Sequence, residues 1–217
     1  MTGLVITIAQ RKGGAGKTTL VAQLAVAWVR QGARVAVLDI DPQGSLVAWV
    51  DLRRGPLGAD AIGFDFAALP GWRAAPWIND RARLTDIVVI DNPPHAETEA
   101  QIAVRAAGLV LIPVQPSPLD LWATEATLKM VRNERRRSLI VLNRVPPRSS
   151  MTDRIAADLA MSGPIAAARI GNRVALVRAM ASGLGVGESE STSHAAAEIA
   201  ALADEVRRLS APISSRA

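Results

Sequence analysis

Two lysines flank a glycine turn near the start of the chain, in the run Lys12-Gly13-Gly14-Ala15-Gly16-Lys17-Thr18-Thr19. Lysine is scarce elsewhere, because 22 of the 25 basic residues are arginines. Backbone N–H groups in such a turn carry partial positive charge, and glycines leave no Cβ between the backbone and phosphate oxygens. Lys17 is expected to reach the β- and γ-phosphates of a nucleotide, and the Thr18 hydroxyl to ligate Mg²⁺. The run therefore predicts a phosphate-binding loop.

The loop departs from the usual pattern at its first positions. An apolar strand at residues 4–9 precedes it and a helical pattern follows, which is the context that a phosphate loop requires. The usual first glycine would fall at Arg11, and Lys12 is an additional lysine. An ordinary strand-to-helix turn is the alternative, but it would need neither the Lys17-Thr18 pair nor so many glycines.

Three aspartates, Asp39, Asp41 and Asp91, end or follow buried strand patterns. A magnesium-dependent triphosphate hydrolase needs one carboxylate to hold the metal's water shell and another to position the attacking water. Asp91 is expected to be a direct or water-mediated partner of Mg²⁺. The alternative role for each aspartate is that of a turn residue or a helix cap.

Strand patterns alternate with helix patterns along nearly the whole chain. Strands are predicted at residues 4–9, 34–39, 86–90, 109–114, 138–143 and 165–169. Helices are predicted at residues 18–30, 97–107, 119–132, 152–161, 172–181 and 193–209. Residues 53–82 hold much of the proline and glycine and are predicted to be irregular. Continuous apolar strands between amphipathic helices predict an α/β fold with a mostly parallel twisted sheet and helices on both faces.

Composition excludes several classes of function. The chain has no cysteine, which excludes disulfides, thiolate nucleophiles, cysteine-held zinc and iron–sulfur clusters. The apolar fraction of 49% is that of a folded protein, and the longest aliphatic runs have only strand length. Neither a signal peptide nor a membrane span fits these runs, so the predicted location is the cytoplasm.

Positive charge is concentrated in one part of the chain. Residues 129–178 carry eleven lysines and arginines against three acids, whereas the whole chain has a net charge of +5. Such asymmetry favours a polyanionic partner. The alternative for any single arginine is an internal salt bridge or a solvated helix end. The candidate contacts are Arg135, Arg136, Arg137, Arg148, Arg154, Arg169, Arg173 and Arg178.

Together the motifs resemble those of one family. The loop Lys12–Thr18 is similar to the deviant Walker A loop of the ParA/MinD family of ATPases. Residues 39–44 resemble that family's second motif, and residues 87–91 with Pro93-Pro94 resemble its Walker B motif. Residues 111–120 are like a stretch found in the short, ParF-like members. The resemblance covers essentially the whole chain and implies a single-domain P-loop NTPase spanning residues 1–217, with 210–217 as a flexible tail.

The resemblance also implies roles for individual residues, in a sandwich homodimer that holds two ATP molecules between facing subunits. Lys12 would cross to the partner's phosphates, and Lys17 and Asp41 would complete the catalytic set. Asp39 and Asp91 would join Thr18 at Mg²⁺. The predicted nucleotide contacts are Gly13, Gly14, Ala15, Gly16, Lys17, Thr18, Thr19 and, at the adenine edge, Asn143. Asn92 stands where a small or hydroxyl residue was expected.

The function implied is that of an ATP-dependent partition or positioning ATPase. Its ATP-bound dimer would bind non-specific DNA of the nucleoid through arginines, among them Arg148, Arg154, Arg169, Arg173 and Arg178. No arginine of the loop is placed as an internal finger. Basal hydrolysis is therefore expected to be slow until a ParB-type or adaptor protein stimulates it. The cargo depends on that partner.

Two other members of the same superfamily remain as alternatives. A membrane-surface regulator of the MinD kind would need a basic amphipathic end helix, whereas residues 193–209 are rich in alanine and their apolar face is expected to be core. No stable membrane association is therefore predicted. A metabolic ATP-dependent ligase would need a substrate pocket, for which residues 53–82 are the spare material. Iron–sulfur members need cysteines, and a larger ParA would need a DNA-reading domain before the loop.

Overall fold

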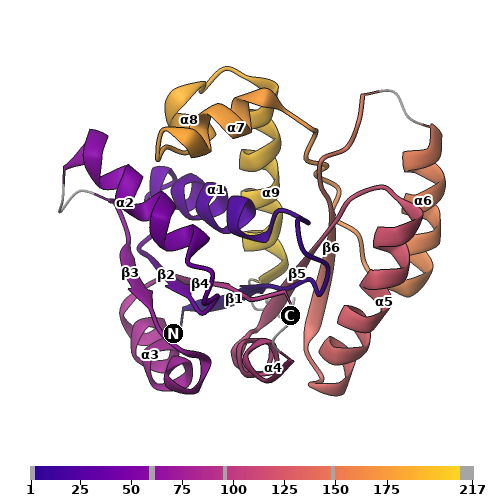
Figure 1. Ribbon diagram of the computed structural model, residues 1–217, viewed down its shortest axis with the longest axis horizontal. Coiled ribbons are helices and arrows are strands. Elements are labelled where there is room, and N and C mark those ends of the chain that lie inside the picture. The colour runs from indigo at the N-terminus through magenta and orange to yellow at the C-terminus, as the bar shows by residue number, and fades with distance from the viewer. Residues whose placement is uncertain (1–2, 59–61, 95–96, 148–149, 211–217) are drawn as a thin grey trace, which may run out of the picture.

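Six parallel strands form one sheet, in the order β3-β2-β4-β1-β5-β6 (Figure 1). The computed structural model describes residues 3–58, 62–94, 97–147 and 150–210. The strands are β1 (Leu4–Ile8), β2 (Val35–Asp39), β3 (Asp65–Ala68), β4 (Ile87–Asp91), β5 (Leu109–Val114) and β6 (Arg137–Leu142). This sheet confirms the predicted α/β fold class.

The strand order reverses around β1. Its neighbours are β4 on one side and β5 on the other, so the segment that leaves the carboxyl end of β1 lies at a topological switch point. Parallel α/β sheets bind ligands in the crevice outside the strand ends at such a point. The register places Asp91 beside both Ile8 of β1 and Asp39 of β2. The loop after β1 and both aspartates therefore share one edge of the sheet.

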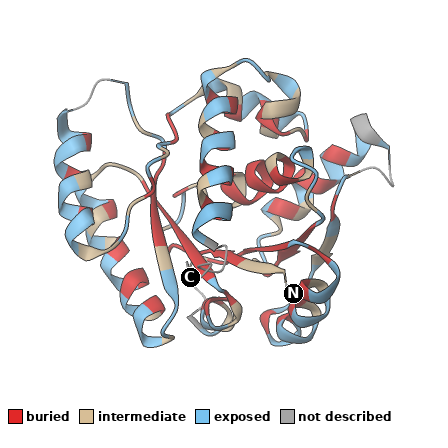
Figure 2. Cartoon of the chain, turned by 180° about the vertical axis from the view of Figure 1, so that it is seen from behind, coloured by how far each residue is buried: buried red, intermediate tan, exposed pale blue. Residues whose placement is uncertain are grey.

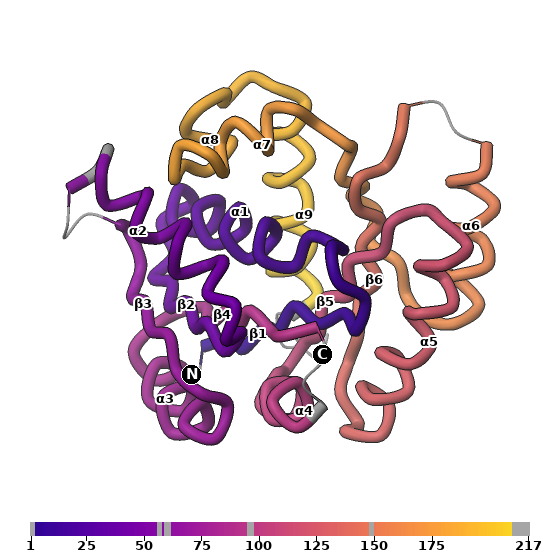
Figure 3. The backbone as a smooth tube through the Cα atoms, in the orientation of Figure 1, coloured from indigo at the N-terminus to yellow at the C-terminus, as the bar shows by residue number. Residues whose placement is uncertain are grey.

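Helices cover both faces of the sheet. They are α1 (Lys17–Arg30), α2 (Ser45–Leu57), α3 (Gly71–Leu84), α4 (Glu97–Ala106), α5 (Pro118–Asn133), α6 (Ser150–Ser162), α7 (Val174–Ala181), α8 (Val186–Ser189) and α9 (His194–Ser210). In Figure 3, α1, α2 and α7–α9 lie on one side of the sheet, while α3, α4, α5 and α6 lie on the other. The hydrophobic clusters divide in the same way.

The core follows from the sequence pattern. Strands β2, β4 and β5 are buried along their whole length, and most helices are buried only on the side that faces the sheet (Figure 2). The apolar face of α9, with Leu202 and Val206, is buried in the cluster that contains α1. Trp28 of α1 is fully buried and donates its Nε1–H to the carbonyl of Ala203, 3.2 Å away. The face predicted to be core in the last helix is therefore core.

The described part of the segment 53–82 is mostly regular, so the prediction of an irregular segment is wrong there; residues 59–61 lie outside the described residues. The end of α2, the edge strand β3 and most of α3 occupy this segment. In α3 the residues Ala74, Ile78 and Ala82 recur every fourth position and are buried against the sheet. Their burial stabilises a helix that contains Pro76. The density of proline and glycine concealed this pattern.

The predicted strand at 165–169 is also wrong. Only Ile165 forms a bridge, with Ile140 of β6. The N–H groups of Ala167 and Ala168 donate to the Glu205 carboxylate of α9, at 2.8 and 3.0 Å, instead of to a neighbouring strand. A backbone segment whose donors bind a side chain cannot continue the ladder. The short helix α8 was not predicted.

Among the described helices, none combines the length and the apolar character needed to cross a bilayer. Of the predicted tail at 210–217, residues 211–217 lie outside the described part of the chain.

Candidate nucleotide-binding site

The predicted phosphate loop connects β1 to α1. Gly14 and Gly16 have left-handed backbone angles, with φ of 76° and 90°, and Gly16 is the N-cap of α1. Because glycine carries no side chain, it leaves the first N–H groups of α1 available to an anion at the positive end of the helix dipole. The loop lines an open cavity of about 380 Å³, together with Asp41, Gln43 and Arg144 from other elements.

Two amide side chains hold the loop in this conformation. Asn143, which follows β6, donates its Nδ2–H to the carbonyl of Ala15 at 2.8 Å. Gln115, which follows β5, donates its Nε2–H to the carbonyl of Gly14 at 2.9 Å. A Cβ at Gly16 would lie 2.5 Å from Asn143 Nδ2, so only glycine allows this contact. Sequence reasoning assigned Asn143 to the adenine edge, and that assignment stays a prediction beside the observed contact with the loop.

The carboxylates of Asp39, Asp41 and Asp91 lie beside the loop. Thr18 Oγ1 donates to Asp91 Oδ2 at 2.7 Å, and the backbone N–H of Asp41 donates to Asp39 Oδ1 at 2.8 Å. Burial raises the pKa of Asp91 to about 7 and that of Asp39 to about 6. Lys17 is also buried, and desolvation lowers its pKa.

These groups fit a hydrated Mg²⁺ bound with a phosphate. Among the described residues, the buried atoms Asp91 Oδ1 and Asp39 Oδ2 accept no hydrogen bond. Unpaired buried carboxylate oxygens are costly unless a cation or its water shell approaches them. In the described chain, no group of three or more acidic or histidine side chains could hold a metal by itself. Magnesium commonly binds one or two carboxylates together with waters and substrate phosphates, which agrees with this set.

Lys12 has a partner that the sequence did not predict. Its Nζ lies 2.6 Å from Oδ2 of Asp120, a buried residue in the first turn of α5. Ser117 Oγ, the N-cap of α5, donates to the same oxygen. Asp120 Oδ1 has no hydrogen-bond partner in the described part of the chain. Lys12 is therefore bound within its own subunit, and its predicted contact with a partner's phosphates stays a prediction.

A second cavity of about 220 Å³ adjoins the first. Four residues line both cavities: Gly16, Thr19, Arg144 and Met180. The second cavity is otherwise lined by Asn143, Gly171, Asn172, Arg173, Leu176 and Val177. Its apolar wall from α7 suits the face of a base, so a nucleotide with its phosphates at the loop would place its base here.

Asn92, the departure after the Walker B-like motif, is fully buried. Its Nδ2 lies 3.4 Å from Thr7 Oγ1 of β1, so its side chain points between β4 and β1. It does not belong to the residues that line the loop cavity.

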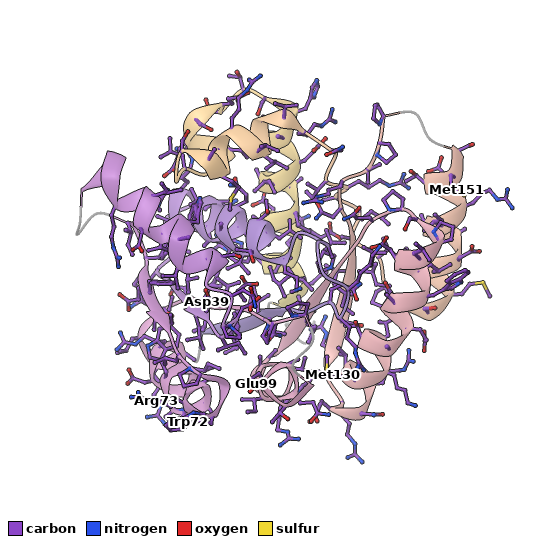
Figure 4. The ribbon with its side chains drawn as sticks, in the orientation of Figure 1. Asp39, Trp72, Arg73, Glu99, Met130 and Met151 are labelled. Atoms are coloured by element: carbon purple, nitrogen blue, oxygen red, sulfur yellow. The ribbon has the colours of Figure 1, made fainter. Side chains whose placement is uncertain are left out.

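Figure 4 places Asp39 near the centre of the molecule, whereas Trp72 and Arg73 lie on the outer part of α3.

The arginines predicted to bind DNA differ in their surroundings. Arg169 pairs with Asp153 at 2.9 Å, Arg173 with Glu198 at 2.6 Å and Arg178 with Glu190 at 3.5 Å. Arg154 is exposed on α6, and Arg148 lies outside the described residues. The run Arg135–Arg137 lies at the amino end of β6, the sheet edge opposite the loop. The structure thus does not bring all these arginines together.

Comparison with known proteins gives relatives along most of the chain. Residues 6–186 match the family described as the CobQ/CobB/MinD/ParA nucleotide binding domain. The chain is 32% identical over 203 residues to maintenance of carboxysome distribution protein A of Halothiobacillus neapolitanus, covering 89% of this chain and 91% of that protein. The cell division ATPase MinD of Pyrococcus furiosus has the same fold, with a TM-score of 0.79 at 23% identity over 95% of this chain and 99% of MinD. Cobyrinic acid a,c-diamide synthase of Mycobacterium smegmatis, solved with an ATP analogue and magnesium, has a TM-score of 0.72 at 22% identity, covering 95% and 94% of the two chains.

Proposed function

Because this chain belongs to the CobQ/CobB/MinD/ParA nucleotide binding domain family, we propose that it is a partition or positioning ATPase. Its ATP-bound form is a sandwich dimer that binds non-specific DNA. One observation carries the proposal: the glycine loop, Thr18, Asp39, Asp41 and Asp91 meet at one edge of the sheet. The likeness to carboxysome distribution protein A over 91% of that protein's length supports the positioning role.

Each residue of the site has a defined task in this function. The loop N–H groups and Lys17 bind the phosphates, and Thr18, with Asp39 and Asp91 behind it, holds Mg²⁺. Bound Mg²⁺ neutralises charge on the phosphate oxygens. Asp41 lines the cavity and its Oδ1 accepts the N–H of Gln43 at 3.0 Å, which orients the carboxylate for positioning water. Thr19 and Asn143 contact the rest of the nucleotide.

Dimerisation is proposed to change the contacts of Lys12. In the ATP-bound dimer Lys12 leaves Asp120 and binds the phosphates of the facing subunit, and the twofold symmetry makes the contact mutual. The dimer then binds one DNA molecule through two basic surfaces. Because only the ATP-bound form dimerises, the nucleotide state sets the affinity for DNA. A ParB-type or adaptor protein stimulates hydrolysis and releases the dimer from the nucleoid, which distributes a cargo chosen by that adaptor.

A sedimentation experiment tests the function. The protein is incubated with DNA or with anionic liposomes, in the presence of ATP, ADP or no nucleotide. Retention on DNA that requires ATP and falls steeply with salt is the expected result, because phosphate contacts release counterions. Binding to liposomes without binding to DNA would instead identify a membrane-surface regulator.

The Asp41→Ala variant tests the assigned catalytic role. If Asp41 positions the attacking water, the variant should bind ATP, dimerise and remain dimeric, because hydrolysis no longer returns it to the monomer. Size-exclusion chromatography with light scattering in ATP measures this. A variant that stays monomeric in ATP would contradict the role.

One observation favours a second candidate, a metabolic ATP-dependent ligase. A separate cavity of about 390 Å³ lies on the other side of Asp41 and has room for a small substrate. It is lined by Asp39, Asp41, Glu99, Val47 and residues of the β3–α3 connection. The ligase candidate predicts ATP turnover that needs a small molecule and is unaffected by DNA, so stimulation of turnover by DNA and a protein partner would reject it.

A further inference from the structure

Arg144 stands apart from most arginines of the chain in its backbone and its surroundings. It is one of two non-glycine residues in the described chain with positive φ, at 52°. Side chains rarely adopt this conformation, and where it persists at a ligand site the strain commonly serves the ligand. Arg169, Arg173 and Arg178 form ion pairs, whereas no ion pair or side-chain hydrogen bond of Arg144 is found within the described residues.

Neighbouring contacts hold Arg144 in this conformation. Its backbone N–H donates to Asn143 Oδ1 at 3.0 Å, and Asn143 donates in turn to the loop carbonyl of Ala15. On the other side, the N–H of Val145 donates to the carbonyl of Ile170 at 2.9 Å, and Val145 bridges to Gly171. Arg144 is therefore fixed between the phosphate loop and the segment that precedes α7.

Its side chain lies where the two cavities of the site meet. Arg144 lines both the loop cavity and the smaller cavity beside α7, as do Gly16, Thr19 and Met180. In a nucleotide that spans both cavities, the junction is occupied by the atoms between base and terminal phosphates, namely the ribose and the α-phosphate. Of the four shared residues, Arg144 alone carries charge.

We propose that Arg144 is a phosphate-binding residue of the nucleotide site, which contacts the phosphate nearest the ribose. This inference rests on the proposed ATP-binding function. A guanidinium presents parallel N–H donors that match two phosphate oxygens, and its charge persists at any physiological pH. The strained backbone at position 144 directs this fork to the junction.

Nucleotide titration of three variants tests the proposal. Arg144→Gly removes the guanidinium and relieves the positive φ, so the fold is retained. Arg144→Lys keeps the charge without the fork. Arg83→Ala removes an exposed arginine of α3 and serves as the control. Affinities for ADP and for adenosine are measured by calorimetry without Mg²⁺.

Removing a charge-assisted hydrogen bond should weaken ADP binding by Arg144→Gly about 10- to 100-fold, since such bonds contribute well above a neutral hydrogen bond. Adenosine, which has no phosphate, should bind Arg144→Gly and the native protein equally. The ADP affinity of Arg144→Lys should lie between those of Arg144→Gly and the native protein. The ADP affinity of Arg83→Ala should match that of the native protein. Equal ADP affinity of Arg144→Gly and native protein would overturn the proposal, as would parallel losses for ADP and adenosine. Failure of the native protein to bind ADP would instead reject the proposed function itself.

Discussion

Burial of the Asp91 carboxylate disfavours its charged form within the candidate nucleotide site. Its Oδ2 accepts the Thr18 hydroxyl, but its Oδ1 has no partner in the described chain. Burial raises its pKa to about 7, because desolvation disfavours the charged form. A bound cation would remove this penalty. Asp91 thus couples the stability of the nucleotide-free protein to pH and to metal.

The Asp91→Asn variant tests this coupling. The folded protein binds the Asp91 proton more tightly than the unfolded chain, so this residue's contribution to stability falls as pH rises from about 4 to about 7. Removing the charge should therefore raise the melting temperature more at pH 8 than at pH 5, measured in EDTA without nucleotide. An equal increase in melting temperature at pH 5 and at pH 8 would show that ionisation of Asp91 does not destabilise the folded protein. The variant should also lose the stabilisation that Mg²⁺ and ATP give the native protein.

Lys12 compensates the charge of buried Asp120. The ion pair has one solvated partner, since the Lys12 side chain is 35% exposed and that of Asp120 only 1%. Lys12→Ala should lower the free energy of unfolding by about 1–2 kcal/mol, less than for a fully buried pair. Urea denaturation without nucleotide measures this.

Asp120→Asn provides the control for Lys12→Ala. Adding it to Lys12→Ala should restore most of the stability, because no unpaired charge then remains. With ATP, Lys12→Ala should still bind nucleotide but fail to dimerise or hydrolyse it. Normal dimerisation of the variant would contradict a role for Lys12 across the subunit interface.

At the scale of elements, Arg53 joins α2 to the α7–α8 hairpin. Its guanidinium is buried, pairs with both Glu188 carboxylate oxygens at 2.8 Å, and lies against the stacked rings of Trp49 and Phe64. The turn at Gly183 approaches the backbone of Arg53 so closely that a Cβ there would collide with it. Since α2 follows Asp41 and α7 lines the smaller cavity beside the loop, this contact fixes both walls of the candidate site relative to each other.

Arg53→Met should destabilise the protein strongly. The substitution leaves the half-buried Glu188 carboxylate without its cation, and breaking such a pair costs about 3–5 kcal/mol. Urea denaturation measures the decrease in the free energy of unfolding. Arg54→Met is the matched control: its arginine is the next residue, pairs with Asp51 on the surface, and should change stability by less than about 0.5 kcal/mol. Equal effects of the two substitutions would contradict the role given to Arg53.

The elements that were predicted correctly are those whose apolar residues either form a continuous run or recur at helical spacing. Continuous apolar runs identified β2, β4 and β5, and helical spacing identified α1, α5 and α9. The errors have a common cause, since tertiary contacts decided the local structure. The sheet stabilises α3 in spite of Pro76, and the Glu205 carboxylate takes the donors that a strand at 165–169 would have used.

The same distinction applies to the site. The loop and the three aspartates were predictable, because strand-end positions in a parallel sheet converge on one edge. The partner of Lys12 was not, because Asp120 is 108 residues away and nothing in its local pattern indicates the pairing. The contact of Gln115 with the carbonyl of Gly14 was missed for the same reason. The only local signal for Gln115 and Asp120 was the stretch 111–120, which begins inside the fourth apolar run at 109–114.

For the molecule as a whole, ion pairing changes the meaning of the basic segment. Residues 129–178 carry an excess of eight positive charges, yet Arg169, Arg173 and Arg178 have acidic partners from other elements. Arg173 pairs with Glu198 of α9, which also accepts the N–H of Gly171. Such an arginine supports the fold next to the smaller cavity of about 220 Å³. An exposed arginine such as Arg154 is better suited to bind a phosphate backbone.

The contrast between Arg154 and Arg173 gives a test of the proposed DNA surface. The slope of log affinity against log salt concentration changes by about 0.9 for each DNA phosphate that the protein no longer neutralises. Arg154→Ala should weaken ATP-dependent DNA binding and reduce that slope, with melting temperature and nucleotide affinity unchanged. Arg173→Ala should lower the melting temperature through the freed Glu198 carboxylate and leave the slope as it was. If Arg154→Ala keeps the full slope, the DNA does not contact Arg154. The run Arg135–Arg137, at the opposite edge of the sheet, is then the next surface to substitute. DNA bound there would be separated from the nucleotide by the length of the strands.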